Sequence, residues 1–123
     1  MVAGIRAADD PVAGLRKAIL AYDAKRYPTA IAALQDLHVP KLPDYTAWYL
    51  ASAQHELKDY AEAITALEPV WRNDPVSPLL GGAVLLAADA YLKSGQPAES
   101  RRIARERYEI GRASCRERVY VLV

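Results

Sequence analysis

Apolar residues recur through most of this chain at intervals of three and four positions, which is the period of an α-helix with one buried face. In the first such stretch the apolar positions are Val12, Leu15, Ile19 and Tyr22. No segment between residues 11 and 108 alternates apolar and polar residues as a half-buried β-strand would. The pattern therefore predicts an all-α protein.

Proline, glycine and acidic residues divide this pattern into six expected helices. Asp10–Pro11 is a start signal, because aspartate caps free amide groups and proline fits the first helical position. Gly95 is a stop signal, because glycine adopts the left-handed conformation that ends many helices. Asp44 is expected to cap the third helix, and Pro69 to bend the last turn of the fourth. The expected helices cover about 11–24, a stretch opened by Pro28, a stretch capped by Asp44, 61–71, 77–94 and 97–108.

A sequence phrase occurs twice, 33 positions apart, and a looser third copy begins at Ser94-Gly95-Gln96. The coinciding residues are Tyr27 with Tyr60, Ala30 with Ala63, Ile31 with Ile64 and Leu34 with Leu67. A period in the low thirties, with small residues where helices cross, is typical of stacked helical hairpins. We therefore expect an all-α, right-handed array of about three antiparallel hairpins. The side chains expected to be buried are Ala30, Ile31, Leu34, Leu50, Ala63, Ile64, Leu67 and Ala88.

Composition narrows the class of protein. The chain has 123 residues, a net charge of +1 and 52% apolar residues, which fits one folded domain and argues against a disordered polymer or a nucleic-acid footprint. The apolar run from Leu79 to Leu92 is too short and too interrupted to span a bilayer. The first ten residues contain no apolar signal-peptide core, so we expect no secretory signal.

The composition changes after Tyr108. Residues 109–119 read EIGRASCRERV, which resembles a conceptual translation of a common short-read sequencing adapter, and the alternative is a natural basic tail. We therefore expect a frayed N-terminus over residues 1–10, a helical-repeat domain over 11–108 and a non-native tail over 109–123 that contributes nothing to the fold.

Candidate chemistry is sparse. His38 and His55 lack a second ligand at metal-binding spacing, and Cys115 has no activating partner nearby in sequence. Gly81-Gly82 lies inside an apolar helical run, where it favours close helix packing over phosphate binding. The sequence predicts no catalytic residue, no metal site and no cofactor.

The repeated positions resemble the tetratricopeptide repeat. The best unit joins Trp48–Ala53 to Asp59–Ile64, whereas the third copy departs from the pattern with Pro97 in place of tyrosine and Arg101 and Arg102 at places that are usually apolar. Adaptors of this class that grip a terminal carboxylate use cations and asparagines on the concave face. The corresponding places here hold Leu15, Ile19, Tyr49 and Leu86, so that partner is not expected.

A narrower likeness runs from Asp44 to Glu99. The segments Asp44–Gln54, Leu67–Trp71, Pro75–Gly81 and Ala87–Glu99 look like the N-terminal helical region of some bacterial soluble lytic transglycosylases. In that family an α-superhelix precedes a lysozyme-like domain that cleaves peptidoglycan in the cell envelope. The resemblance implies a non-catalytic scaffold fragment, placed in the periplasm or cell envelope. The alternative is a free-standing adaptor that binds a protein or peptide.

In such repeats the first helix of each hairpin lines the concave face, which defines a candidate binding surface. Its expected members are Tyr45, Trp48, Ser52, His55, Glu56, Asp89 and Lys93. An exposed aromatic ring among polar groups would suit a peptide or a sugar. The alternative is that Trp48 packs against a neighbouring repeat that is missing from this chain.

Overall fold

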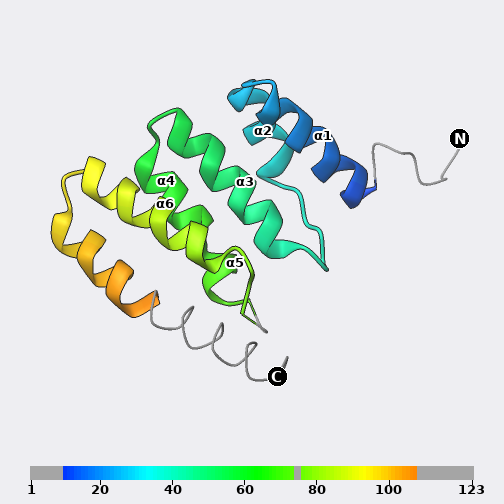
Figure 1. Cartoon of the computed structure of the whole chain (residues 1–123). Coiled ribbons are helices and arrows are strands. Elements are labelled where there is room, and N and C mark those ends of the chain that lie inside the picture. The colour runs from blue at the N-terminus through cyan, green and yellow to red at the C-terminus, as the bar shows by residue number, and fades with distance from the viewer. Residues whose placement is uncertain (1–9, 74–75, 108–123) are drawn as a thin grey trace, which may run out of the picture.

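The computed structural model describes residues 10–73 and 76–107, and all regular structure within these ranges is helical (Figure 1). The helices are α1 (Pro11–Asp23), α2 (Tyr27–Leu34), α3 (Pro43–Glu56), α4 (Tyr60–Ala66), α5 (Glu68–Trp71), α6 (Leu80–Lys93) and a further helical stretch over residues 97–107. The predicted all-α array is confirmed. The expectations for the N-terminal segment up to residue 9 and for the tail 109–123 lie outside the described residues.

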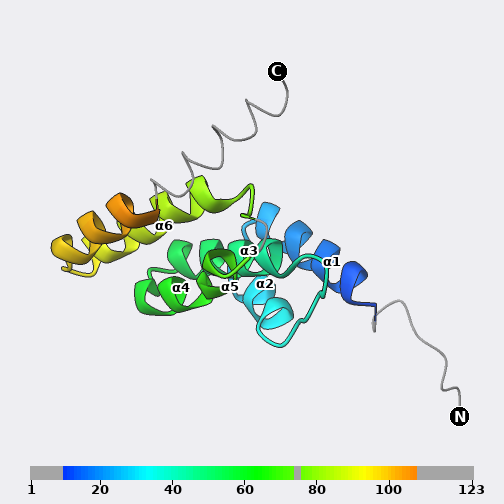
Figure 2. The same ribbon diagram turned by 90° about the horizontal axis from the view of Figure 1, so that it is seen from below.

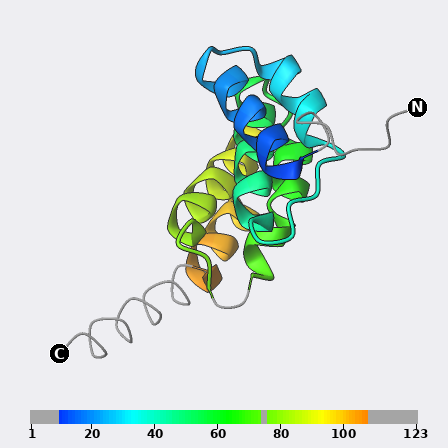
Figure 3. The same ribbon diagram turned by 90° about the vertical axis from the view of Figure 1, so that its right-hand side faces the viewer.

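The helices pair as three antiparallel hairpins. Hairpin one is α1 with α2, hairpin two is α3 with α4, and hairpin three is α6 with residues 97–107. We call α1, α3 and α6 the first helices, and each one contacts the next along the array. Two views at right angles place hairpin one at one end and residues 97–107 at the other (Figures 1 and 3). Seen from below, α4 and α5 lie on one side of α3 with α2 close by (Figure 2).

All three hairpins turn in the same way. The residue after each first helix's cap has a left-handed backbone, with φ of 62° at Lys25, 66° at Lys58 and 82° at Gly95. In each turn this residue's amide donates to a carbonyl three residues back and the next amide to a carbonyl five residues back, at 2.8–3.2 Å. This is the Schellman arrangement, which satisfies the free carbonyls at a helix end. The sequence indicated it only at Gly95, because lysine carries no signal for a left-handed backbone.

Small residues let the helices approach closely, as the repeats predicted. Ala30 and Ala63 in the second helices are fully buried, and so are Ala18 and Ala51 in the first helices. Leu34 and Leu67 are also buried and fill the space beside them. The crossing positions of hairpins one and two are therefore confirmed.

Part of the predicted core is only half-buried. The prediction of a buried side chain was wrong at four positions, which have intermediate exposure: Ile31, Leu50, Ile64 and Ala88. Leu50 and Ile64 line grooves between neighbouring hairpins, where one edge of the side chain stays open to solvent. Val12, which was placed on the buried stripe of the first helix, is 48% exposed.

The predicted fourth helix is two helices. α4 ends at Ala66 and α5 begins at Glu68, instead of one helix that bends near its end. Pro69 has no amide hydrogen and cannot continue the helical ladder, so the chain tightens before it. The amide of Leu67 bonds to the Ile64 carbonyl, three residues back, at 3.2 Å.

Asp44 does not cap α3, contrary to the sequence prediction. The cap residue is Leu42, without a side-chain hydrogen bond, and Pro43 opens the helix. The buried Asp44 carboxylate lies in the first turn, where the helix dipole favours negative charge, and accepts the Ser77 hydroxyl at 2.5 Å. Ser77 also accepts the Leu79 amide at 3.1 Å, so residues 77–79 form a turn and α6 starts at Leu80, later than predicted.

Candidate binding surfaces

The first helices of hairpins two and three meet through a cluster of titratable groups. His55 Nε2 lies 2.5 Å from Asp89 Oδ2, and Lys93 Nζ lies 3.1 Å from the same oxygen. The His55 side chain is 15% exposed and its ring meets the Tyr60 ring edge-on at 5.4 Å. The cluster therefore joins α3 to α6 and holds the imidazole in one place.

Charge and hydrogen bonding shift the pKa values in this cluster. Partial burial raises the pKa of Asp89, but hydrogen bonds from Lys93 and His55 outweigh it and hold the pKa below its usual value. The same contact raises the pKa of Lys93, mainly through its hydrogen bond to Asp89. Asp89 is consequently ionised near neutral pH, when its contacts are strongest.

The first helices of hairpins one and two meet through neutral groups. The Tyr22 phenol lies beside the buried Ser52 side chain, and its ring meets Tyr49 at 5.5 Å and Tyr27 at 5.6 Å, both edge-on. Burial raises the pKa of Tyr22, and the Glu56 carboxylate raises it further. An aromatic cluster therefore takes the place of the ion pair.

The two contacts occupy the same register. Tyr22 and His55 each stand three residues before the left-handed turn residue, and Ser52 and Asp89 each stand six residues before theirs. Each first helix thus reaches the next through equivalent positions. The polar groups predicted as a ligand surface serve, in part, to hold the stack together.

Trp48 packs against the neighbouring hairpin. Its Cη2 atom lies only 3.1 Å from the point where a Cβ atom on Gly82 would stand, whereas a Cβ on Gly81 would meet nothing within 4 Å. Gly82 therefore makes room for the Trp48 indole. The prediction that the glycine pair allows close helix packing holds for Gly82 and does not hold for Gly81. This contact agrees with the alternative in which Trp48 packs against a neighbouring repeat. That repeat is hairpin three of the same chain and is not missing.

The seven predicted surface residues lie in different surroundings. Trp48, His55 and Asp89 form the contact between α3 and α6. Tyr45 packs in the apolar cluster around Leu15 in hairpin one. The remaining three are the buried Ser52, the exposed Glu56 and Lys93, which is half exposed beside Asp89.

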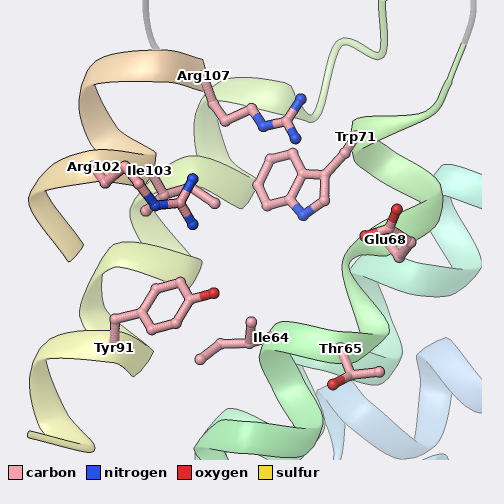
Figure 4. A pocket seen from close by; sticks show the side chains of 8 residues that line it. All are labelled: Ile64, Thr65, Glu68, Trp71, Tyr91, Arg102, Ile103 and Arg107. Carbon is pink, nitrogen blue, oxygen red and sulfur yellow. The ribbon is translucent and has the colours of Figure 1, made fainter. Parts of the chain in front are cut away.

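A groove that the sequence did not indicate lies between hairpins two and three (Figure 4). Its volume is about 330 Å³, and its lining is Ile64, Thr65, Glu68, Trp71, Tyr91, Arg102, Ile103 and Arg107. The Arg107 guanidinium lies 5.4 Å from the Trp71 ring centre, and Arg102 pairs with Glu99 and Glu106 at 2.8 and 3.0 Å. The one available signal was Arg102, a charge at a place where repeats are usually apolar.

Residues 10–73 and 76–107 contain neither a cluster of metal-ligating side chains nor a helix that could cross a membrane. No group of three or more histidine, cysteine or acidic side chains could hold a metal ion there. No helix in those ranges is long and apolar enough to cross a membrane.

Comparison with known proteins identifies the central hairpin. The tetratricopeptide repeat family model matches residues 45–75, which cover most of α3 and all of α4 and α5. No curated protein and no solved structure matches the chain. The neighbouring hairpins share the turn geometry and contact register of the matched one. Residues 45–75 therefore match a tetratricopeptide-type helical repeat, which forms the central unit of the described helical array.

Proposed function

We propose that this chain is a non-catalytic helical-repeat scaffold that acts by binding other proteins. The observation that carries the proposal is the use of the His55–Asp89 pair in the contact between α3 and α6, at the register of Tyr22 and Ser52. The packing of α3 against α6 therefore explains why His55, Asp89 and Lys93 lie together. Stacked repeats present extended surfaces, which suit macromolecular partners.

The more specific proposal is that the scaffold belongs to a cell-wall lytic transglycosylase. Its support is the sequence resemblance over Asp44–Glu99 to the helical region of those enzymes. In such a parent the array would shape or dock the catalytic domain around peptidoglycan, in the periplasm or cell envelope. The alternative is a free-standing adaptor, which is favoured by the exposed apolar side chains of α6.

Resequencing the genomic locus beyond codon 108 tests the parent. A lysozyme-like domain with a catalytic glutamate supports the transglycosylase, whereas a stop codon after a polar capping helix supports the adaptor. The same read tests the adapter origin that we propose for residues 109–119, because genomic codons for EIGRASCRERV would overturn it.

Zymography on peptidoglycan tests the non-catalytic role. The purified chain should give no clear band beside a lysozyme control, and it should release no soluble muropeptides. A clear lytic band would overturn the scaffold proposal, whatever the genomic locus encodes.

A further inference from the structure

The groove between hairpins two and three combines apolar side chains with hydrogen-bond donors (Figure 4). α4 and α5 contribute Ile64 and Trp71 to it, whereas α6 and residues 97–107 contribute Tyr91 and Ile103. Its volume of about 330 Å³ is at the lower end of the roughly 300–1,000 Å³ that is typical of small-molecule sites. The groove therefore has the size and the mixed lining of a site for a small ligand.

Two donors in this groove are unpartnered. Figure 4 shows the indole nitrogen of Trp71 and the hydroxyl of Tyr91 turned toward the space between the two rings. Neither group has a hydrogen-bond partner among residues 10–73 and 76–107, and both side chains are half-buried. A ligand with acceptor oxygens would complete their hydrogen bonding.

The charges around the groove leave one cation without a carboxylate. Each of the three guanidinium nitrogens of Arg102 lies 2.8–3.0 Å from a carboxylate of Glu99 or Glu106. Arg107, in contrast, has no acidic partner within the described ranges, and its guanidinium lies 5.4 Å from the Trp71 ring centre. Arg107 is therefore the group that can pair with the anion of a ligand.

The same contacts argue against a cationic ligand. Aromatic ring faces attract cations, but Arg107 already lies over the Trp71 ring and would repel a second positive charge. The acidic residue in the lining, Glu68, is paired with Arg72 at 3.5 Å. An anion with an apolar body consequently matches this groove better than a cation does.

A further repeat would not fill this groove. The equivalent groove between hairpins one and two has a volume of about 460 Å³, and Gln35 and His38 line it 33 positions before Glu68 and Trp71. That groove remains open although hairpin three follows it in the array. By the same geometry, a repeat added after hairpin three would leave the groove between hairpins two and three open. Both of its walls belong to the chain itself.

We propose that this groove binds a small carboxylic acid with an apolar body. The carboxylate pairs with the Arg107 guanidinium, and the body lies against Ile64 and Ile103 between the two aromatic rings. Guanidinium and carboxylate groups form paired, charge-assisted hydrogen bonds, and the rings and isoleucines remove the apolar body from water. This small-molecule site goes beyond the proposed scaffold function and does not depend on it.

NMR spectroscopy of the full chain, titrated with phenylacetate and with phenylacetamide, tests the class of ligand. The two probes share one ring and differ in charge. The indole N–H signal of Trp71 reports on the groove, and that of Trp48, which packs over Gly82, is the internal control. We expect phenylacetate to shift the Trp71 signal, to bind at least about tenfold more tightly than the amide, and to weaken as salt is raised. Equal affinity for the two probes would overturn the proposal.

Inorganic phosphate tests the apolar part of the ligand. It carries negative charge without an apolar body, so it should bind at least about tenfold more weakly than phenylacetate. Phosphate binding as tight as that of phenylacetate would mean that the groove recognises charge alone, and it would overturn the proposal.

Matched variants locate the site. Arg107→Gln should abolish the preference for phenylacetate over its amide, whereas Arg105→Gln, at an exposed position of the same helical stretch, is the control and should leave it unchanged. Glu68→Gln should tighten phenylacetate about twofold or more, because it removes a like charge from the lining. Circular dichroism verifies that each variant is folded. An unchanged preference in Arg107→Gln, or weaker binding in Glu68→Gln, would overturn the proposal.

Two further outcomes would assign the groove to the chain itself and overturn the proposal. Phenylacetate binding that tightens more than about tenfold when residues 109–123 are deleted would identify the tail as the occupant. Sedimentation showing an oligomer that phenylacetate dissociates would identify a second copy. A lytic band in zymography would remove the scaffold function alone, so the two failures are distinguishable.

Discussion

The two contacts between successive first helices use equivalent positions but opposite chemistry. α1 meets α3 through the Tyr22 phenol and the Ser52 hydroxyl, with aromatic rings around them. α3 meets α6 through His55 and the Asp89 carboxylate, with Lys93 beside them. The backbone register is therefore shared while the side-chain pair is not.

The difference shows which features of the chain determine how its helices are arranged. Identical Schellman turns and fully buried alanines set the spacing and direction of the helices. Once these are set, a neutral pair and a charged pair both fit, provided that each buried donor finds its acceptor. The two contacts should consequently respond differently to mutation and to pH.

The largest expected effect falls on the shared framework. Ala63→Leu should lower the free energy of unfolding by about 1–3 kcal/mol, because Ala63 is fully buried where helices cross and extra methylenes force the helices apart. Thr65→Leu, on the exposed side of α4, should change it by less than about 0.5 kcal/mol. Chemical denaturation measures both, and equal shifts for the two variants would refute the assigned register.

Removing one partner from each contact compares the pairs directly. His55→Ala should cost about 1–1.5 kcal/mol, since hydrogen bonds to charged groups are stronger, although the 40% exposed Asp89 can regain water. Ser52→Ala removes a buried neutral hydroxyl beside the Tyr22 phenol and should cost about 0.5–1 kcal/mol. Thermal unfolding of the two variants at pH 7 ranks them, and a larger loss for Ser52→Ala would contradict the comparison.

The turns offer a gain in stability. Lys25→Gly and Lys58→Gly should each stabilise the array by about 0.5–1 kcal/mol, because glycine accepts a positive φ that strains a lysine. Gly95→Ala should cost about 1 kcal/mol for the converse reason. Lys17→Gly, inside α1, is the control and should destabilise by about 0.5–1 kcal/mol. Melting temperatures of the four variants test this, and a loss at Lys25 or Lys58 would show that the turn is not strained.

The smallest expected effects on stability are those of pH. Low pH should weaken the contact that uses Asp89, and high pH should weaken the contact that uses Tyr22. The folded pKa of Asp89 lies below its ordinary 3.8, so its stabilisation is present above that value and is lost as the pH falls through the folded pKa. The folded pKa of Tyr22 lies above 10.0, so its stabilisation is present below pH 10 and is lost as the pH rises through the folded pKa.

Both contributions should be a few tenths of a kcal/mol, because solvent screens a carboxylate that is 40% exposed and Tyr22 is only partly buried. The measurement is the free energy of unfolding against pH for Asp89→Asn and Tyr22→Phe beside the parent chain. Asp89→Asn should flatten the acid limb and also alter the alkaline limb, because Asp89 raises the pKa of Lys93. Tyr22→Phe should flatten the alkaline limb alone. An altered acid limb in Tyr22→Phe would show that the contacts are not independent.

The sequence by itself determined the elements and their repetition. Apolar periodicity, the Asp10–Pro11 start and the Gly95 stop are local signals, and the structure has a helix at each. Two of the repeated alanines, Ala30 and Ala63, were also correctly placed in the core, since their register recurs in the printed sequence. Local signals suffice for such features because each hairpin is built from contacts close in sequence.

Only the tertiary structure decided which distant side chains meet. His55 and Asp89 are 34 residues apart, and Ser77 and Asp44 are 33 residues apart, so no local pattern pairs them. The offset and twist between stacked hairpins bring Trp48 over Gly82. Those geometric quantities arise from close packing of whole helices, and close packing depends on every side chain at the contact at once.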